Sequence, residues 1–158
     1  MEEIGWNLEE LVKEDVDRIK EVFRKSDEDE WKTGMERKST LYIYRKQKKR
    51  PEEGRYFNDE KSMIIFRIRT NTAKLKYWER HAGGEVACGL CGGDVEDLEH
   101  FMVWCAELQG IRNEILKLQR PLEEDVHEVL GAVIFEKSYE EIIYRMWKRR
   151  SEILMGES

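Results

Sequence analysis

The sequence predicts a mainly α-helical fold, in which a small helical domain is organised around one cluster of cysteine and histidine residues. Two observations lead to this prediction. Apolar residues recur every three or four positions through most of the chain, which is the spacing of amphipathic helices. All three cysteines of the 158-residue chain fall within 18 positions of one another, with a histidine between them. An odd, clustered set of cysteines is typical of residues that share a metal ion rather than of a disulfide framework.

The first expected helix covers residues 7–25, and Asn7 stands where an N-cap belongs. Its apolar residues follow helical spacing and are Leu8, Leu11, Val12, Val16, Ile19, Val22 and Phe23. The acidic stretch 26–31 is predicted to be a connector. Residues 1–36 are therefore expected to form an acidic amphipathic helix with its connector, and residues 37–158 a single folding unit.

The rest of the chain predicts further helices separated by turns. Helices are expected at 39–49 and 59–69, the second capped by Asp59, and Pro51 makes 50–54 a loop. Glycines at 83–84 and 89–93 favour tight turns, with room for a short β-hairpin around the cysteines. Three more helical segments are expected, at 95–118 with an interruption near Cys105, at 123–135 and at 139–154.

Cys88 and Cys91 form a Cys-x-x-Cys pair, His100 follows after eight residues, and Cys105 after four more. Four ligands of this kind fill the coordination shell of Zn²⁺ and leave no position for water or substrate, so a zinc ion held here is structural. The alternatives are three buried cysteines with a surface histidine, or a redox pair, although no βαβ pattern surrounds the pair. His81 and His127 stand apart from the cluster and are expected to be surface or capping residues.

The net charge of −6 hides an uneven distribution. Residues 37–80 contain 14 Lys or Arg against 5 Asp or Glu, whereas the remainder has 14 against 29. Any polyanion site therefore belongs to the middle segment. The candidate contacts to RNA or DNA are Arg45, Lys46, Lys48, Lys49, Arg50, Arg67, Arg69, Lys74 and Lys76. The plainer interpretation is a solvated helix end near 45–50, with at least one of Arg67 and Arg69 packed internally.

Other chemistry finds no support in the sequence. Trp78 and Trp104 flank the cluster and are expected to fill the core beside it rather than to stack on bases. The four carboxylates at 94–99 are expected to be the acidic first turn of a helix. No phosphate loop and no nucleophile with a partner base is present, so the chain is not expected to be an enzyme. No apolar run approaches the length of a membrane span, and an intracellular location in nucleus or cytoplasm is expected.

Several short signatures occur in a characteristic order. They are Phe66-Arg67-Ile68-Arg69-Thr70-Asn71-Thr72, Tyr77-Trp78-Glu79-Arg80, Cys88-Gly89-Leu90-Cys91-Gly92, Leu98-Glu99-His100-Phe101 and finally Cys105. Over residues 39–150 this order resembles the zinc-binding C-terminal region of non-LTR, jockey-like retrotransposon polyproteins, which follows the reverse transcriptase domain. The resemblance implies that the cysteines and His100 bind zinc and that the segment with Arg67 and Arg69 contacts element RNA or target DNA. The Tyr-x-Asp-Asp polymerase signature is absent.

The sequence thus predicts a zinc-stabilised module that positions RNA or DNA through phosphate contacts of segment 37–80. Two alternatives stay open at this stage. The first is a zinc-stabilised protein-interaction module, whose terminal helices bind a partner or mediate self-association. The second is a retroelement fragment that folds but has no function.

Overall fold

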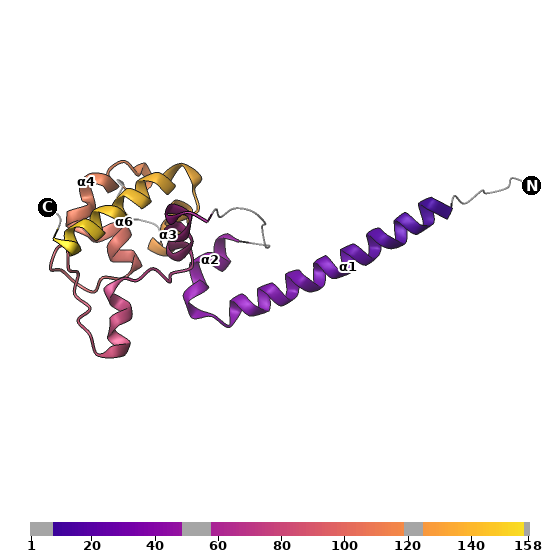
Figure 1. Cartoon of the computed structure of the whole chain (residues 1–158), viewed down its shortest axis with the longest axis horizontal. Helices are drawn as coiled ribbons and strands as arrows, with labels where there is room; N and C mark the ends of the chain where they lie inside the picture. Colours follow the sequence, from indigo (N-terminus) through magenta and orange to yellow (C-terminus); the bar gives the residue numbers. More distant parts are fainter. Residues whose placement is uncertain (1–7, 49–57, 119–124, 157–158) are drawn as a thin grey trace, which may run out of the picture.

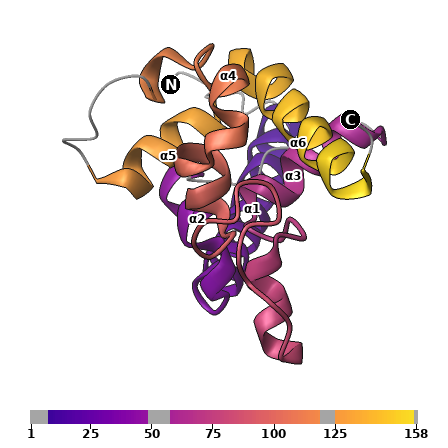
Figure 2. The ribbon, with the colours of Figure 1, turned by 90° about the vertical axis from the view of Figure 1, so that its left-hand side faces the viewer.

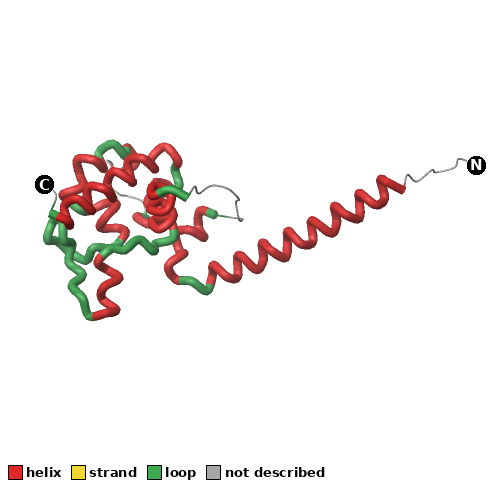
Figure 3. Tube along the Cα trace, viewed as in Figure 1, coloured by secondary structure: helices red, strands yellow, loops and turns green. Residues whose placement is uncertain are grey.

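The computed structural model of the chain describes residues 8–48, 58–118 and 125–156 (Figure 1). These residues are mainly helical, as the sequence predicts, and they form no β-strand (Figure 3). One isolated antiparallel bridge, between Ala87 and Val95, is all the β-pairing found in the described ranges. The expected hairpin around the cysteines is therefore reduced to a single bridged pair. No described helix is long and apolar enough to cross a membrane.

Helix α1 spans Leu8–Glu36 and projects away from the rest of the molecule (Figure 1). The predicted connector at 26–31 is wrong, because the helix runs straight through it. The acidic stretch contains no proline or glycine, and Arg24 forms ion pairs with Glu21 and Glu28 across successive turns, which support a solvated helix. The expected N-cap, Asn7, lies outside the described residues.

Two further helices follow the predicted pattern. The 3₁₀ turn η1 (Ser39–Leu41) leads into α2 (Tyr42–Gln47), and the expected loop 50–54 lies outside the described residues. Helix α3 spans Glu60–Arg69. The Asp59 carboxylate accepts a 2.9 Å hydrogen bond from the Ser62 backbone N–H, which confirms Asp59 as its N-cap.

The C-terminal half consists of short helical turns and two longer helices. In chain order they are the 3₁₀ helix η2 (Lys76–Ala82), the π-helix η3 (His100–Trp104), η4 (Ala106–Leu108), α4 (Gln109–Arg112), η5 (Leu116–Leu118), α5 (Val126–Ile134), η6 (Lys137–Tyr139) and α6 (Glu140–Met155). The predicted interruption near Cys105 is confirmed. Gly156 ends α6 in the left-handed conformation at φ 76°, which glycine adopts without steric cost.

A single hydrophobic core joins these elements, and Figure 2 shows how their backbones are arranged. Helix α6 packs against α3 and α4, while α5 packs against α2. Apolar side chains that are at most 1% exposed come mainly from α2, α3, η3, η4, α5 and α6 and include Ile43, Ile68, Phe101, Met102, Leu108, Ile115, Leu130, Val133, Ile143 and Met146. Among described side chains α1 contributes only Met35 to the buried set, so the helix is attached to the body by its C-terminal end alone.

Candidate metal centre

The first two cysteines lie on a tight turn. The Cys88 N–H donates to the Asp94 carbonyl at 3.0 Å, and the Gly92 N–H donates back to the Cys88 carbonyl at 2.9 Å. Gly92 has φ 67°, in the left-handed region where a side chain would be strained. The glycine after the second cysteine is therefore required by the backbone, because it lets the chain reverse directly behind Cys91.

The other two predicted ligands lie at the two ends of the π-helix η3, because His100 is its first residue and Cys105 directly follows its last. The Cys105 N–H donates to the His100 carbonyl at 2.8 Å, which is a hydrogen bond across five residues. In an α-helix each residue turns by about 100°, so residues five apart would point about 140° away from each other. The wider π turn brings His100 and Cys105 to the same side. The Asp97 carboxylate accepts from the His100 N–H at 2.8 Å and holds the start of this turn.

The four predicted ligands converge. The Sγ atoms of Cys88, Cys91 and Cys105 and a ring nitrogen of His100 all lie within 4.8 Å of one another. The Cys88 and Cys105 Sγ atoms are 3.8 Å apart, and Cys91 Sγ is 3.3 Å from His100 Nε2. Two thiolates bound at 2.3 Å to a tetrahedral ion are separated by about 3.8 Å. The cluster can therefore hold one metal ion.

The electrostatics of the cluster also favour a cation. Burial, and then the charge of the neighbouring Cys88, raises the pKa of the Cys105 thiol to about 12. Burial acts to raise the pKa of Cys91, but the net effect is a lowered pKa. Hydrogen bonds to its thiolate from the Gly93 backbone and from the Cys88 and Cys105 side chains outweigh the burial. Several neighbouring thiolates therefore repel one another when no cation is bound, and a divalent ion would offset their negative charge. All three cysteines are free of disulfides.

A buried arginine lies next to the cluster. Arg112 is 8% exposed and its Nη1 donates to the Cys105 carbonyl at 3.0 Å. Burial lowers the pKa of Arg112, while the nearby Cys105 acts to raise it. A cation at this position suits a metal site with three thiolates and a net negative charge. The sequence analysis did not single out Arg112, which lies seven residues beyond the last ligand.

The expected acidic first turn is only partly correct. Asp97 does cap the turn that carries His100. Glu96, however, is 1% exposed and accepts two 2.7 Å hydrogen bonds from Arg150, while its backbone carbonyl accepts from Tyr77 N–H. Glu96 therefore ties the cysteine turn to α6 and η2 instead of facing solvent. Glu96 is one of several acidic residues in this stretch, and nothing in the sequence distinguishes it from the others.

The aromatic and histidine neighbours are placed as follows. Trp104 is 55% exposed, so the prediction that it fills the core is wrong; the π turn directs it outward. Trp78 is half-buried and packs edge-on against Tyr77. His81 is exposed, and His127 lies 3.3 Å from the Tyr42 hydroxyl; neither belongs to the cluster, as predicted.

The predicted nucleic-acid contacts fall into different environments. Arg69 is 3% exposed, donates to the Ile134 carbonyl and pairs with Glu140 at 2.8 Å, so it holds α3 against the start of α6 and cannot reach a phosphate. Lys48 is also buried, and Lys49 and Arg50 lie outside the described residues. The remaining candidates are exposed or half-buried, namely Arg45, Lys46, Arg67, Lys74 and Lys76.

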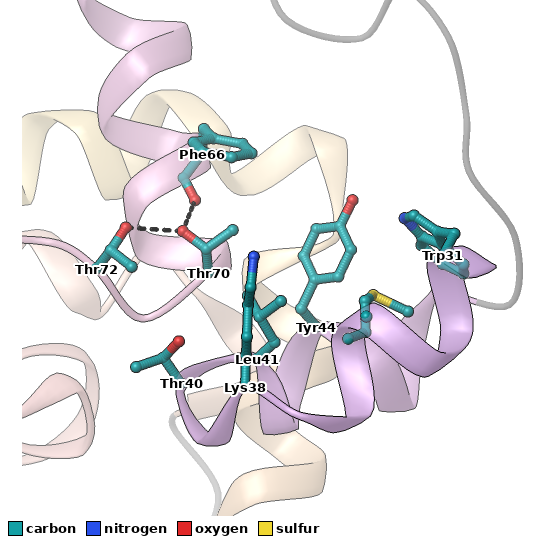
Figure 4. A pocket seen from close by; sticks show the side chains of 10 residues that line it. Trp31, Lys38, Thr40, Leu41, Tyr44, Phe66, Thr70 and Thr72 are labelled. Atoms are coloured by element: carbon teal, nitrogen blue, oxygen red, sulfur yellow. Dashed lines mark hydrogen bonds between the residues drawn. The ribbon is translucent and has the colours of Figure 1, made fainter.

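A hollow of about 470 Å³ lies between the end of α1, α2 and α3 (Figure 4). Trp31, Tyr44 and Phe66 contribute aromatic rings, and the exposed Lys38 points into it. On the opposite side the Thr70 hydroxyl bonds to the Phe66 carbonyl and to the Thr72 hydroxyl, both at 2.9 Å. The sequence analysis missed this hollow, because Trp31 and Lys38 precede the segment that they meet by more than 25 residues.

Comparison of the chain with protein-family models, with curated proteins and with solved structures gives no match.

Proposed function

We propose that the chain is a zinc-stabilised nucleic-acid-binding module, and that Cys88, Cys91, His100 and Cys105 hold one Zn²⁺. The support for zinc is the donor set. Three thiolates and one imidazole in a closed tetrahedral arrangement suit Zn²⁺, whereas Mg²⁺ and Ca²⁺ prefer oxygen ligands. The ion would join the cysteine turn to the π-helix and stabilise the fold, with no coordination site left for a substrate.

One observation carries the nucleic-acid part of the proposal: five cations of the basic segment have no carboxylate partner among the described side chains, although Lys61 and Arg69 of the same segment are paired. Among the described side chains, no carboxylate lies within ion-pair distance of Lys38, Lys46, Arg67, Lys74 or Lys76. By contrast, the cations of α6 are paired, since Arg145, Lys148, Arg149 and Arg150 contact Glu114, Glu60, Glu152 and Glu96. Five such cations gathered within residues 37–80 of a net acidic chain favour a polyanionic partner.

The hollow adds a feature that suits single strands. Lys38 reaches the turn around Thr70 and Thr72, which connects Arg67 to Lys74. A base stacked on Tyr44 or Phe66 would place its phosphates beside these cations. Aromatic stacking next to a basic track is the usual way in which proteins bind single-stranded nucleic acid. We therefore favour single-stranded RNA or DNA over a duplex.

The proposal includes a relationship to the C-terminal region of non-LTR retrotransposon polyproteins. Its support is that the resembling segments contact one another. The backbone N–H of Lys76 donates to the Glu96 carboxylate at 2.9 Å, and Tyr77 N–H donates to the Glu96 carbonyl. These bonds join the Tyr77-Trp78 segment to the turn that carries the metal ligands.

The proposal is tested by titrating the zinc-loaded protein with single-stranded RNA and DNA oligonucleotides at several salt concentrations. We expect the logarithm of the binding constant to fall with the logarithm of salt by about 0.7 for each neutralised phosphate. Arg67→Ala and Lys74→Ala should each reduce that slope by about 0.7. Arg149→Ala, which removes a cation already paired with Glu152, is the matched control and should leave the slope unchanged. Absent binding, or binding that is insensitive to salt, would overturn the proposal.

A further inference from the structure

Helix α1 carries an apolar stripe that nothing in the described part of the chain covers. From Lys13 to Glu30 every residue except Glu28 is exposed. Val16, Ile19, Val22 and Phe23 are 42%, 55%, 67% and 66% exposed. Most helices in proteins owe their stability to packing of such a face, because isolated helices are marginal in water. An exposed stripe of this kind on a projecting helix (Figure 1) indicates an interaction surface.

The spacing of the stripe is that of a coiled coil. Val16, Ile19 and Phe23 are separated by three and then four residues, and Val12 continues the series with an interval of four in the sequence. Alternating intervals of three and four give the 3.5-residue repeat that two helices need to keep one seam in contact. In heptad terms Val12 and Ile19 take d positions, and Val16 and Phe23 take a positions.

The charges on either side of the apolar stripe favour a second copy of α1 as the partner helix. Asp15 takes the g position and Lys20 the following e position, one on each side of the stripe, and both are exposed. In a parallel, in-register pair of α1 helices, Asp15 of each copy faces Lys20 of the other, which gives two attractions by symmetry. In an antiparallel pair the e positions face each other, so Lys13 would meet Lys20. The charge pattern therefore complements a second copy in the parallel orientation.

The position of the stripe leaves room for such a pair. Trp31, the first α1 residue that lines the hollow shared with α2 and α3, lies eight positions after Phe23. At 1.5 Å per residue the seam ends about 12 Å before this contact with the body. Two copies can therefore join their α1 helices while the bodies lie side by side at the same end.

We propose that the chain self-associates through a parallel coiled coil of α1 helices, with Val16, Ile19 and Phe23 in the seam and Asp15–Lys20 pairs between copies. This assembly does not depend on nucleic-acid binding. Its first test is the mass of the full chain in solution, measured by light scattering over a range of protein concentrations. We expect the mass to exceed the 19.0 kDa of one chain and Ile19→Asn to return it to that value. Glu14→Asn, which introduces the same residue on the opposite face, should retain the assembly.

The charge pairs give the sharper test, because they distinguish this partner from others. Asp15→Lys or Lys20→Asp alone should raise the dissociation constant about tenfold, since two attractions become repulsions. When the two variants are mixed, every flanking pair is again attractive, so we expect mixed assemblies to exceed either variant alone. A monomer at all concentrations, an Ile19→Asn chain that still associates, or single charge variants that associate as well as the wild type would each overturn the proposal.

Discussion

Arg150 and Glu96 lie 54 residues apart in the sequence and form a two-pronged ion pair inside the protein, with both bonds at 2.7 Å. Glu96 is 1% exposed and Arg150 is 7% exposed. The pair joins the turn that carries the first two metal ligands to the long C-terminal helix. This contact therefore couples the position of the turn with Cys88 and Cys91 to that of α6.

Removing the Glu96 carboxylate should strongly destabilise the fold. Glu96→Ala leaves the Arg150 guanidinium buried without a charge partner, and breaking a buried pair in this way costs about 3 to 5 kcal/mol. The free energy of unfolding by urea measures this loss. Glu114→Ala breaks the exposed pair between Glu114 and Arg145 and should change the value very little. Equal effects of the two variants would contradict the role assigned to Glu96.

Substitutions of Arg67 and Arg69 should have different effects, one on nucleic-acid affinity and the other on stability, although the two residues lie only two positions apart. Arg69→Ala removes a buried side chain that pairs with Glu140 and donates to Ile134, so we expect a loss of about 3 kcal/mol of stability. Arg67→Ala should leave stability within about 0.5 kcal/mol but weaken RNA or DNA binding. Thermal unfolding and oligonucleotide titration of both variants check this division, which a reversed pattern would refute.

Loss of one metal ligand should remove the ion and loosen the body. In Cys91→Ser the remaining donors cannot close the shell, and structural zinc contributes folding free energy on the order of 10 kcal/mol in small domains. Metal analysis should find about one zinc per wild-type chain and none in the variant, with a lower unfolding temperature. His127→Asn, outside the cluster, is the control and should keep its zinc. A Cys91→Ser chain with unchanged metal content would contradict the assignment of the ligands.

Metal affinity should rise with pH through the neutral range. The pKa of Cys105 in the metal-free site is about 12, so the thiol carries its proton at every pH below that value and loses it when the ion binds. Proton release makes binding more favourable as pH increases. Apparent zinc affinity, measured by chelator competition at several pH values, should increase at least in proportion to hydroxide concentration. An affinity independent of pH would show that no thiol proton is displaced.

Phe66 provides a test of base stacking in the hollow. Phe66 is 43% exposed, and Phe66→Leu should weaken binding of single-stranded oligonucleotides by about 1 to 3 kcal/mol if one base stacks on the ring. The neighbouring Met63 is similarly exposed on α3, and Met63→Leu should have no effect on affinity. The two variants behaving alike in oligonucleotide titrations would exclude stacking on Phe66.

The parts that could be predicted from sequence are those with a local signal. Helical spacing located α3 and α6 closely, Asp59 was recognisable as a cap, and the four residues of the Cys/His cluster could be selected because cysteine is rare and the intervals are characteristic. The extension of α1 through 26–31 was missed. A polar stretch without regularly spaced apolar residues is compatible with a helix as well as with a connector.

Long-range partners had no signal in one sequence. The pairing of Glu96 with Arg150, and of Arg69 with Glu140, depends on which helices pack together, and charged residues of all environments look the same along the chain. The hollow and the exposure of Trp104 depend on tertiary structure in the same way. These features need the fold before they can be identified.

The π-helix has a consequence for insertions and deletions in the chain. Residues four apart in an α-helix point to nearly the same side, about 40° from each other. Deleting Trp104, the exposed residue of the turn, would convert the π turn to an α turn, leave Phe101, Met102 and Val103 at their places and keep His100 and the last cysteine on one face. We expect the shortened chain still to bind one metal ion, so the interval between His100 and the last cysteine should tolerate the loss of one residue.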